Sequence, residues 1–397
     1  MRRALVAITL LLLACAPAAQ AISASTLRSS LRRAMRATSP ASGAYVRDLT
    51  TGRTLFSYKA GTKRSPASVE KLYTTSTALL RFGPAAALTT TVLGTGSLDA
   101  LGIYHGDLYL RGGGDPTLST TGIVALADAL AGSGISRVVG SVRGDESRFD
   151  LLRGSFDTAG AYDPDMGGVL GAMVVNRGFA KDGRPAADAA RRLTTALRGV
   201  GVKVSRKAGV AVTPPGAVAL ASLPSPPIGD LIRLTNVPSD NYYAETLLKD
   251  LGASFGGAGT TAAGATVVRA QMAAFGIRPV VVDGSGLSRV DHTSPRQIVT
   301  LFARMHAQPA LAATFEGSLA VAGRSGTLVN RLRGTAAQDR CHGKTGTLFG
   351  VSALSGICQA IGGHTIAFAL LMNRALILPA HRVQDRIATA IARYTGR

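Results

Sequence analysis

The chain is poor in aromatic residues and in patterns that bind metals. Aromatic residues make up 5% of its 397 residues, and its basic residues are scattered rather than interleaved with aromatic ones. This composition argues against a nucleic-acid-binding protein. The six histidines form neither a His-Glu-x-x-His motif nor a Cys/His ligand spacing. We therefore expect no bound metal and no cofactor.

Acidic residues are also scarce. The 23 Asp and Glu residues are outnumbered by 44 Lys and Arg, which gives a formal charge of +21. This excess indicates either a compositional bias towards arginine and alanine or attraction to a polyanion, such as a cell-wall polymer or an anionic membrane face. The hydrophobic content of 46% is typical of packed globular chains, and the length indicates two or three structural units.

Lysine is rare among the basic residues, because only eight of the 44 are lysines. Two of the eight lie in short motifs. Arginine could not replace a lysine that has to lose its proton, since a guanidinium stays charged at any working pH. In chain order, the motifs are Ser68-Val69-Glu70-Lys71, Ser239-Asp240-Asn241 and Lys344-Thr345-Gly346.

The first 21 residues have the features of a signal peptide. A basic start, Met1–Arg3, precedes the apolar run Ala4–Ala14 and the small-residue cleavage site Ala19–Ala21. Alternatively, Leu12–Cys15 resembles a lipoprotein box in which Cys15 carries a lipid. In both cases we expect an exported protein, either free in the periplasm or lipid-anchored at the membrane, with at most peripheral membrane contact.

Two cysteines remain beyond the leader. Cys341 and Cys358 flank the lysine-threonine-glycine motif, and a hairpin turning at Phe349–Gly350 would bring them side by side. Because export compartments are oxidising, we predict a disulfide across this hairpin. The alternative is a pair of free buried thiols.

The motifs lie in two separated parts of the chain, residues 22–85 and 228–397. Between them, residues 86–227 are rich in glycine and short strand patterns, with one helix-like run at Gly122–Ala131. We therefore predict an α+β protein in which one catalytic domain is split by a β-rich inserted domain. A helix is expected over about Ala67–Phe82, and a last one over about Ala380–Tyr394.

The first motif has the spacing of a nucleophile and its base. Residues three apart share a helix face, so Ser68 and Lys71 can touch. Pro66 suits a helix start, which places Ser68 in the first turn, where the helix dipole favours a developing alkoxide. A buried Lys71 amine could then accept the hydroxyl proton. By itself, a Ser-x-x-Lys motif is weak, since chance produces it in a chain of this length.

The second motif has two interpretations. Ser239 or Asp240 could simply cap the helix that follows. In the catalytic interpretation, Ser239 relays a proton between Lys71 and the leaving group, while Asn241 holds a substrate amide and orients Lys71.

The third motif starts a predicted strand. Lys344 and Thr345 would bind a terminal carboxylate, and Gly346 leaves room for a substrate backbone alongside the strand. The backbone N–H groups of Ser68 and Thr347 would form an oxyanion hole. The alternative is a basic strand residue beside a turn.

Together these motifs resemble the D-alanyl-D-alanine carboxypeptidase/endopeptidases of the low-molecular-mass class C penicillin-binding proteins. The resemblance covers nearly the whole mature chain. Its most specific stretches are Arg64–Lys71, Pro238–Glu245, Gly343–Leu348, Leu108–Pro116 and Asp283–Ser288.

The resemblance implies a penicillin-binding acyl-transferase fold, in which helices cover an antiparallel sheet. It assigns Ser68 as nucleophile and Lys71 as base, and makes Asp145 of the insertion a candidate for binding the free amino group of the stem peptide. Members of the family often carry a third domain nested in the insertion. Residues 176–224 are too few for it, so we expect this domain to be missing or reduced.

The expected activity is a serine-type DD-carboxypeptidase or DD-endopeptidase that acts on peptidoglycan and is acylated by β-lactams. Two alternatives stay open at this point. A class A β-lactamase needs a glutamate poised to activate water, but the glutamates of this chain lack that setting. The other alternative is a peptidoglycan-binding protein without catalysis.

Overall fold

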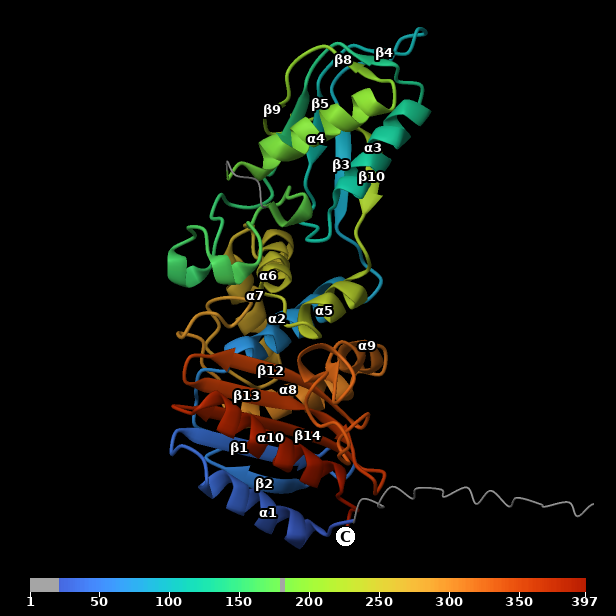
Figure 1. Ribbon diagram of the computed structural model, residues 1–397. Helices are drawn as coiled ribbons and strands as arrows, with labels where there is room; N and C mark the ends of the chain where they lie inside the picture. Colours follow the sequence, from blue (N-terminus) through green and yellow to red (C-terminus); the bar gives the residue numbers. More distant parts are fainter. Residues whose placement is uncertain (1–20, 179–182) are drawn as a thin grey trace, which may run out of the picture.

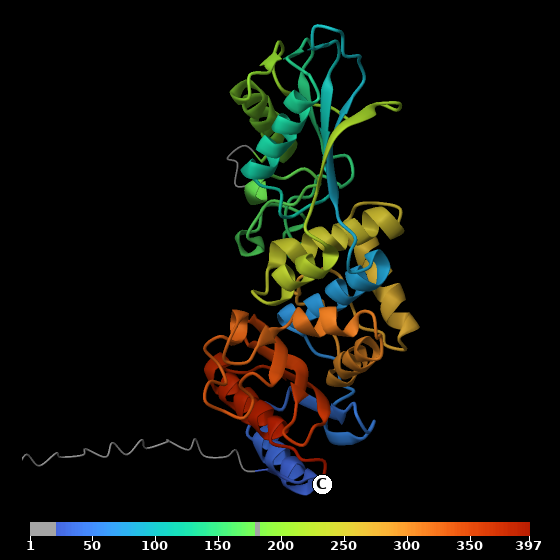
Figure 2. The ribbon, with the colours of Figure 1, turned by 90° about the vertical axis from the view of Figure 1, so that its right-hand side faces the viewer.

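The computed structural model describes residues 21–178 and 183–397. The predicted signal peptide, including Cys15, lies almost entirely outside this range. In Figures 1 and 2 the molecule is elongated, with a sheet at one end, a layer of helices in the middle and the residues of the central part of the chain at the other end. No helix of the described residues has the length and apolar character needed to cross a membrane.

A six-stranded antiparallel sheet joins the first and last parts of the chain. Its order is β11-β12-β13-β14-β1-β2, so strands that are more than 290 residues apart in sequence, β1 and β14, lie side by side and pair directly. The strands are β1 (Ser42–Asp48), β2 (Thr54–Tyr58), β11 (Ala320–Val321), β12 (Cys341–Leu348), β13 (Val351–Gln359) and β14 (Thr365–Asn373).

Helices cover both faces of this sheet. Alternating residues of β14 point to opposite faces, as a strand requires: Phe368 and Leu370 pack with one helical layer, and Ala369 and Leu371 with the other. The first layer contains α1 (Ala24–Arg36) and α10 (Ile377–Ala392), and the second contains α2 (Lys71–Phe82), α5 (Ile228–Asn236), α6 (Asn241–Phe255), α7 (Thr261–Ala274), α8 (Pro295–His306) and α9 (Ala312–Gly317). The α+β class and the covered antiparallel sheet are thus confirmed.

Helix α10 begins three residues earlier than expected. The prediction started it after Pro379, whereas the structure starts it at Ile377. Proline is tolerated in the first turn of a helix, because the N–H that it lacks would have no partner there.

Residues 89–224 form sheets of their own. The five-stranded sheet β10-β3-β5-β7-β9 and the small parallel sheet β4-β6-β8 lie at the far end of the molecule (Figure 1). The strands are β3 (Thr89–Gly94), β4 (Ile103–Tyr104), β5 (Leu108–Arg111), β6 (Arg137–Val138), β7 (Val142–Asp145), β8 (Lys203–Val204), β9 (Gly209–Val210) and β10 (Val218–Pro224).

Two helices, not one, pack on these strands. The predicted run at Gly122–Ala131 is α3 (Thr120–Gly132), but α4 (Pro185–Gly199) was missed. Its signal was present, because the helix starts with proline and its buried positions Ala186, Ala189, Ala190, Leu193 and Leu197 follow a helical period. Residues 176–224 therefore complete the same two sheets, and the loss of a third nested domain stays a prediction.

Candidate active site

The three motifs come together where η1, α6 and β12 meet. Ser68 lies in the short 3-10 turn η1 (Ala67–Glu70), and Lys71 is the first residue of α2. This differs from the single α-helix expected over Ala67–Phe82. Residues three apart in a 3-10 turn eclipse one another, and the distance between Lys71 Nζ and Ser68 Oγ is 3.0 Å.

Lys71 is the centre of a hydrogen-bond network. Its side chain is fully buried. Besides Ser68, the ammonium contacts Asn241 Oδ1 at 2.6 Å and the carbonyl oxygen of Ser285 at 2.7 Å. Ser285 belongs to the stretch Asp283–Ser288, whose sequence was noted without a role. These contacts fix the amine against the hydroxyl that it would deprotonate.

Ser239 and Lys344 form the second contact between motifs. Lys344 Nζ donates to Ser239 Oγ at 2.6 Å and to the carbonyl of Thr345 at 2.9 Å. Ser239 has a φ of +66°, a conformation that non-glycine residues adopt at a cost and that clusters at functional sites. Asp240, and not Ser239, caps α6 by accepting from the N–H of Tyr243. The capping alternative therefore applies to Asp240 alone.

The two glycines of the site serve the chain's own packing. A Cβ on Gly346 would lie 2.5 Å from the carbonyl of Pro66 and 3.1 Å from the amide nitrogen of Ser68. A Cβ on Gly286 would lie 2.1 Å from the carbonyl of Ala67. The close approach of β12 to η1 thus requires glycine at position 346. From the sequence, the glycine at position 346 was explained only by the room that a substrate backbone needs beside the strand.

The two buried lysines have perturbed acidities. Burial lowers the pKa of Lys71 to about 8, although the carboxylates of Asp283, Glu245, Asp240 and Glu70 oppose the shift. Burial, together with the positive charge of Lys71, holds the pKa of Lys344 well below its ordinary value. A lysine whose pKa is near neutrality can act as a general base.

A cluster of buried carboxyl groups lies next to Lys71, and sequence reasoning did not find it. Glu245 accepts from the N–H groups of Gly284 and Ser285, both at 2.8 Å. Asp283 also accepts from the N–H of Ser285 and from two further N–H groups of the same loop. Among the described residues, Glu70 has no hydrogen-bond partner at either carboxyl oxygen. Burial and the neighbouring carboxylates of Asp283 and Glu245 raise the pKa of Glu70 well above its ordinary value.

The central part of the chain closes one side of the site. The amide of Asn241 donates to the carbonyl of Asp165 at 2.7 Å, and Ser288 donates to Asp157 at 2.7 Å. Arg177 forms an ion pair with Asp240. Residues 165–177 therefore lie against the second motif, although they are 62 or more positions away from it in sequence, and Asp157 lies against the loop that carries Ser288.

Thr345 and Thr347 lie on β12 at the edge of the site. The hydroxyl of Thr345 contacts the hydroxyl of Thr327 at 2.8 Å, and Thr347 is exposed.

Asp145, on β7, makes its hydrogen bonds with residues outside the three motifs. Its carboxylate accepts from the N–H of Ser147 at 2.9 Å and from the N–H of Thr213 at 2.8 Å. Its role in binding an amino group stays a prediction.

The predicted disulfide is confirmed. Cys341 on β12 and Cys358 on β13 face each other in the strand register and are bonded, with their Cα atoms 4.0 Å apart. Within the described residues, no group of three or more His, Cys, Asp or Glu side chains could hold a metal ion.

Comparison with known proteins relates this arrangement to one family. The model of the D-Ala-D-Ala carboxypeptidase 3 (S13) family matches residues 26–181 and 181–395. The chain is 31% identical to a D-alanyl-D-alanine carboxypeptidase of Actinomadura sp. (strain R39), with 89% of this chain and 82% of that protein covered. It is also 31% identical to the carboxypeptidase DacB of Mycolicibacterium smegmatis, with 83% of this chain and 76% of that protein covered.

Solved structures share the fold. Penicillin binding protein 4 (dacB) from Haemophilus influenzae superimposes with a TM-score of 0.78 at 18% identity, covering 91% of this chain and 99% of that one. The same protein complexed with a β-lactam superimposes with a TM-score of 0.72 at 19% identity, covering 90% of this chain and 98% of that one.

Proposed function

Because this chain belongs to the D-Ala-D-Ala carboxypeptidase 3 (S13) family and is a serine-type D-alanyl-D-alanine peptidase, we propose that Ser68 is its nucleophile and Lys71 its general base. The observation that carries the proposal is the pair of contacts of Lys71, at 3.0 Å to Ser68 Oγ and 2.6 Å to Asn241 Oδ1. Nucleophile, base and orienting amide are thus within hydrogen-bond reach of one another.

In acylation, Ser68 Oγ attacks the carbonyl carbon of the penultimate D-alanine, and its proton passes to the neutral amine of Lys71. The proton then moves through Ser239 to the departing amine of the terminal D-alanine as the peptide bond breaks. The backbone N–H groups of Ser68 and Thr347 hold the developing oxyanion. Lys344 and Thr345 bind the terminal carboxylate. Water then hydrolyses the ester, releases the shortened peptide and restores the Ser68 hydroxyl.

The substrate in this proposal is the stem peptide of peptidoglycan, and removal of the terminal residue or cleavage of a D-alanyl cross-link would use the same site. β-Lactams would acylate Ser68, as the β-lactam complex of the structural neighbour suggests for this fold. The basic N-terminal leader supports export, with action in the periplasm or at the membrane surface.

Intact mass after brief incubation with penicillin tests the proposal. We expect one stable adduct on the mature protein and none on Ser68→Ala. An adduct that persists in Ser68→Ala would refute Ser68 as the nucleophile. Rapid loss of penicillin without an adduct would instead identify a β-lactamase, and unconsumed penicillin without an adduct would identify a protein that only binds peptidoglycan.

A further inference from the structure

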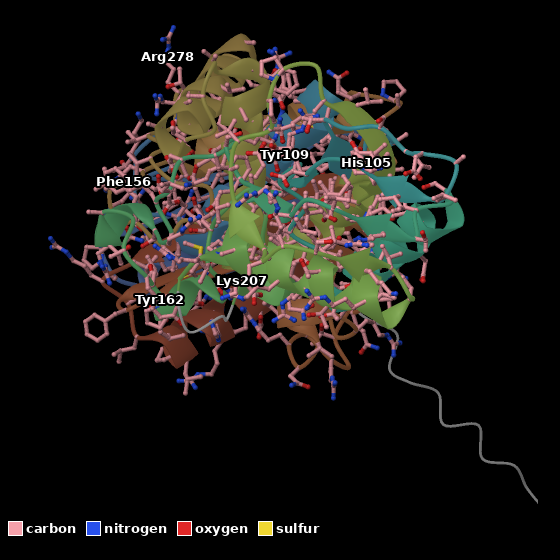
Figure 3. The ribbon with its side chains drawn as sticks, turned by 90° about the horizontal axis from the view of Figure 1, so that it is seen from above. His105, Tyr109, Phe156, Tyr162, Lys207 and Arg278 are labelled. Carbon is pink, nitrogen blue, oxygen red and sulfur yellow. A yellow bond between two sulfur atoms is a disulfide. The ribbon has the colours of Figure 1, made fainter. Side chains whose placement is uncertain are left out.

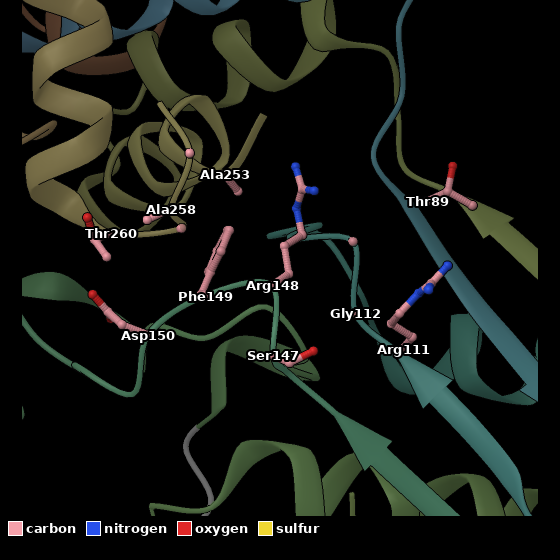
Figure 4. A pocket seen from close by; sticks show the side chains of 13 residues that line it. Thr89, Arg111, Gly112, Ser147, Arg148, Phe149, Asp150, Ala253, Ala258 and Thr260 are labelled. Carbon is pink, nitrogen blue, oxygen red and sulfur yellow. The ribbon is translucent and has the colours of Figure 1, made fainter. Parts of the chain in front are cut away.

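A polar cavity of about 700 Å³ lies between the residue 89–224 region and the helical layer. The arginine side chains that line it, Arg111 and Arg148, extend in a similar direction from neighbouring segments (Figure 4). Small residues near the end of α6 and in the connection that follows it, Ala253 and Ala258 among them, form the opposite wall. Cavities between structural units are frequent ligand sites.

This cavity is separate from the catalytic residues. Helix α6 begins at Asn241 in the active site and reaches the cavity at Ala253. Twelve residues of α-helix span about 18 Å. None of the motif residues lines the cavity, so a ligand there would not need to occupy the catalytic site.

The charge of the cavity wall is positive on balance. Arg148 donates to the buried Asp250 at 3.1 Å and to Ser254 at 2.8 Å. Asp150, the acidic residue of the lining, is paired with Lys249. Arg111 is exposed at the end of β5. Its backbone takes part in the sheet, but its side chain forms no hydrogen bond or ion pair with any residue of the described ranges. Its guanidinium can therefore form a bidentate contact with an oxyanion.

Two glycines let the backbone beside Arg111 pack closely against neighbouring segments. A Cβ on Gly112 would lie 2.0 Å from the carbonyl of Ala172, and one on Gly113 would lie 2.2 Å from the carbonyl of Thr89. These contacts explain why the stretch Leu108–Pro116 has glycine at positions 112 and 113, which take no part in the proposed catalytic mechanism. The two glycines place the backbone tightly between two segments and leave the cavity floor without side chains.

We propose that this cavity binds an oxyanion group, a carboxylate or a phosphate, of a cell-wall polymer. The proposal rests on the proposed function in one respect, because it takes the ligand to be a polymer of the cell wall in which the enzyme acts. A carboxylate would come from a stem peptide and a phosphate from an anionic wall polymer. Binding here would hold the polymer while the catalytic site processes a neighbouring end.

Calorimetric titration tests the proposal with two probes that have no D-Ala-D-Ala end. One is a soluble stem tripeptide with free carboxylates, and the other is polyglycerol phosphate. We expect one of them to bind, and Arg111→Gln to weaken that binding about tenfold, since one charge-assisted contact is lost. Arg278→Gln is the matched control, because Arg278 is exposed and projects outward at the periphery (Figure 3). The probe that binds identifies the source of the oxyanion.

A second pair of variants tests the position of the ligand. Ala258 is an exposed residue of the lining, so Ala258→Glu would place a negative charge in the cavity, while Ala258→Gln adds similar bulk without charge. We expect the Glu variant to bind more weakly than the Gln variant. Binding of neither probe, equal affinity in Arg111→Gln and the unchanged protein, or equal affinity in the two Ala258 variants would overturn the proposal.

Penicillin acylation of the same variants separates the two hypotheses. Arg111→Gln should be acylated at the unchanged rate, because Arg111 does not contact the catalytic network. If Arg111→Gln binds the oxyanion probe more weakly but is acylated at the normal rate, the result supports the cavity proposal and leaves the proposed function untouched. A protein that binds the probes but forms no penicillin adduct would contradict the proposed function and leave the cavity proposal standing.

Discussion

The surroundings of Lys71 and those of Lys344 differ, although both side chains are fully buried in one site. Lys71 faces a loop and two helices that carry Glu70, Glu245 and Asp283, and these carboxyl groups limit the fall of its pKa to about 8. Lys344 lies on a hairpin strand, where burial and the positive charge of Lys71 both lower its pKa. The two lysines are equally buried but differ in pKa, because the charges around them differ.

The two regions are also held in place by different means. The Lys71 side depends on carboxylates that accept backbone N–H groups of the loop 283–288. The Lys344 side depends on the β12–β13 pairing and on the Cys341–Cys358 disulfide. We therefore expect the acidity of the base and the stability of the hairpin to respond to different substitutions.

The largest expected effect separates the two lysines. Lys71→Arg should slow acylation by penicillin about 10³-fold, because a guanidinium cannot act as the base. Lys344→Arg still supplies a cation but loses the contacts of Lys344 to Ser239 and to the carbonyl of Thr345, so a loss of about tenfold is expected. Stopped-flow acylation rates measure both, with the exposed Lys207→Arg as control. Equal losses at positions 71 and 344 would contradict the assignment of Lys71 as base.

Removal of the disulfide tests the hairpin side. Replacing Cys341 and Cys358 together by Ala should lower the free energy of unfolding by about 3 kcal/mol, as expected for a closed loop of this length. Urea denaturation measures the loss. The pH at which acylation is half-maximal should not move, since neither cysteine contributes to the charge around Lys71. A shift of that pH would show that the two regions are coupled.

A substitution of the buried Asp291 tests the electrostatics around Asp283 and Glu70 through the pH dependence of protein stability. Burial, with the charges of Asp283 and Glu70, raises its pKa to about 12. The folded state therefore keeps a proton that the unfolded state loses near pH 4, and stability falls as pH rises between these values. One proton corresponds to about 1.4 kcal/mol per pH unit. Asp291→Asn should flatten the dependence of unfolding free energy on pH by about that amount, and an unchanged slope would refute the burial of a neutral acid.

The smallest effect is a shift of the pH profile. Acylation should rise as pH increases through about 8, because Lys71, the proposed base, can accept a proton only when it is neutral. The Glu245 carboxylate raises the pKa of Lys71, so Glu245→Gln should move the midpoint to lower pH by less than about one unit. Glutamine can still accept from Gly284 and Ser285. Glu316→Gln, on α9, serves as control, and an upward shift in Glu245→Gln would contradict the electrostatic account.

Local patterns were enough to predict much of this molecule. The three-residue spacing of Ser68 and Lys71, the glycine turn at Gly350 and the symmetric placement of Cys341 and Cys358 are short-range features, and the structure brings each pair together. Helix α4 was missed although its signal is equally local. The carboxyl cluster could not be predicted in this way, because Glu70, Glu245 and Asp283 lie in three separate segments and acidic residues are usually exposed.

The sequence by itself determined which chemistry the site can be proposed to perform, since the motif residues supply a candidate nucleophile, a candidate base and a candidate carboxylate-binding cation in chain order. Only the tertiary structure decided how acidic each lysine is, why position 346 must be glycine, and that residues 157–177 close the site. These properties depend on distances between segments that are far apart along the chain. Electrostatic interaction and steric exclusion act through space, so the sequence order does not contain them.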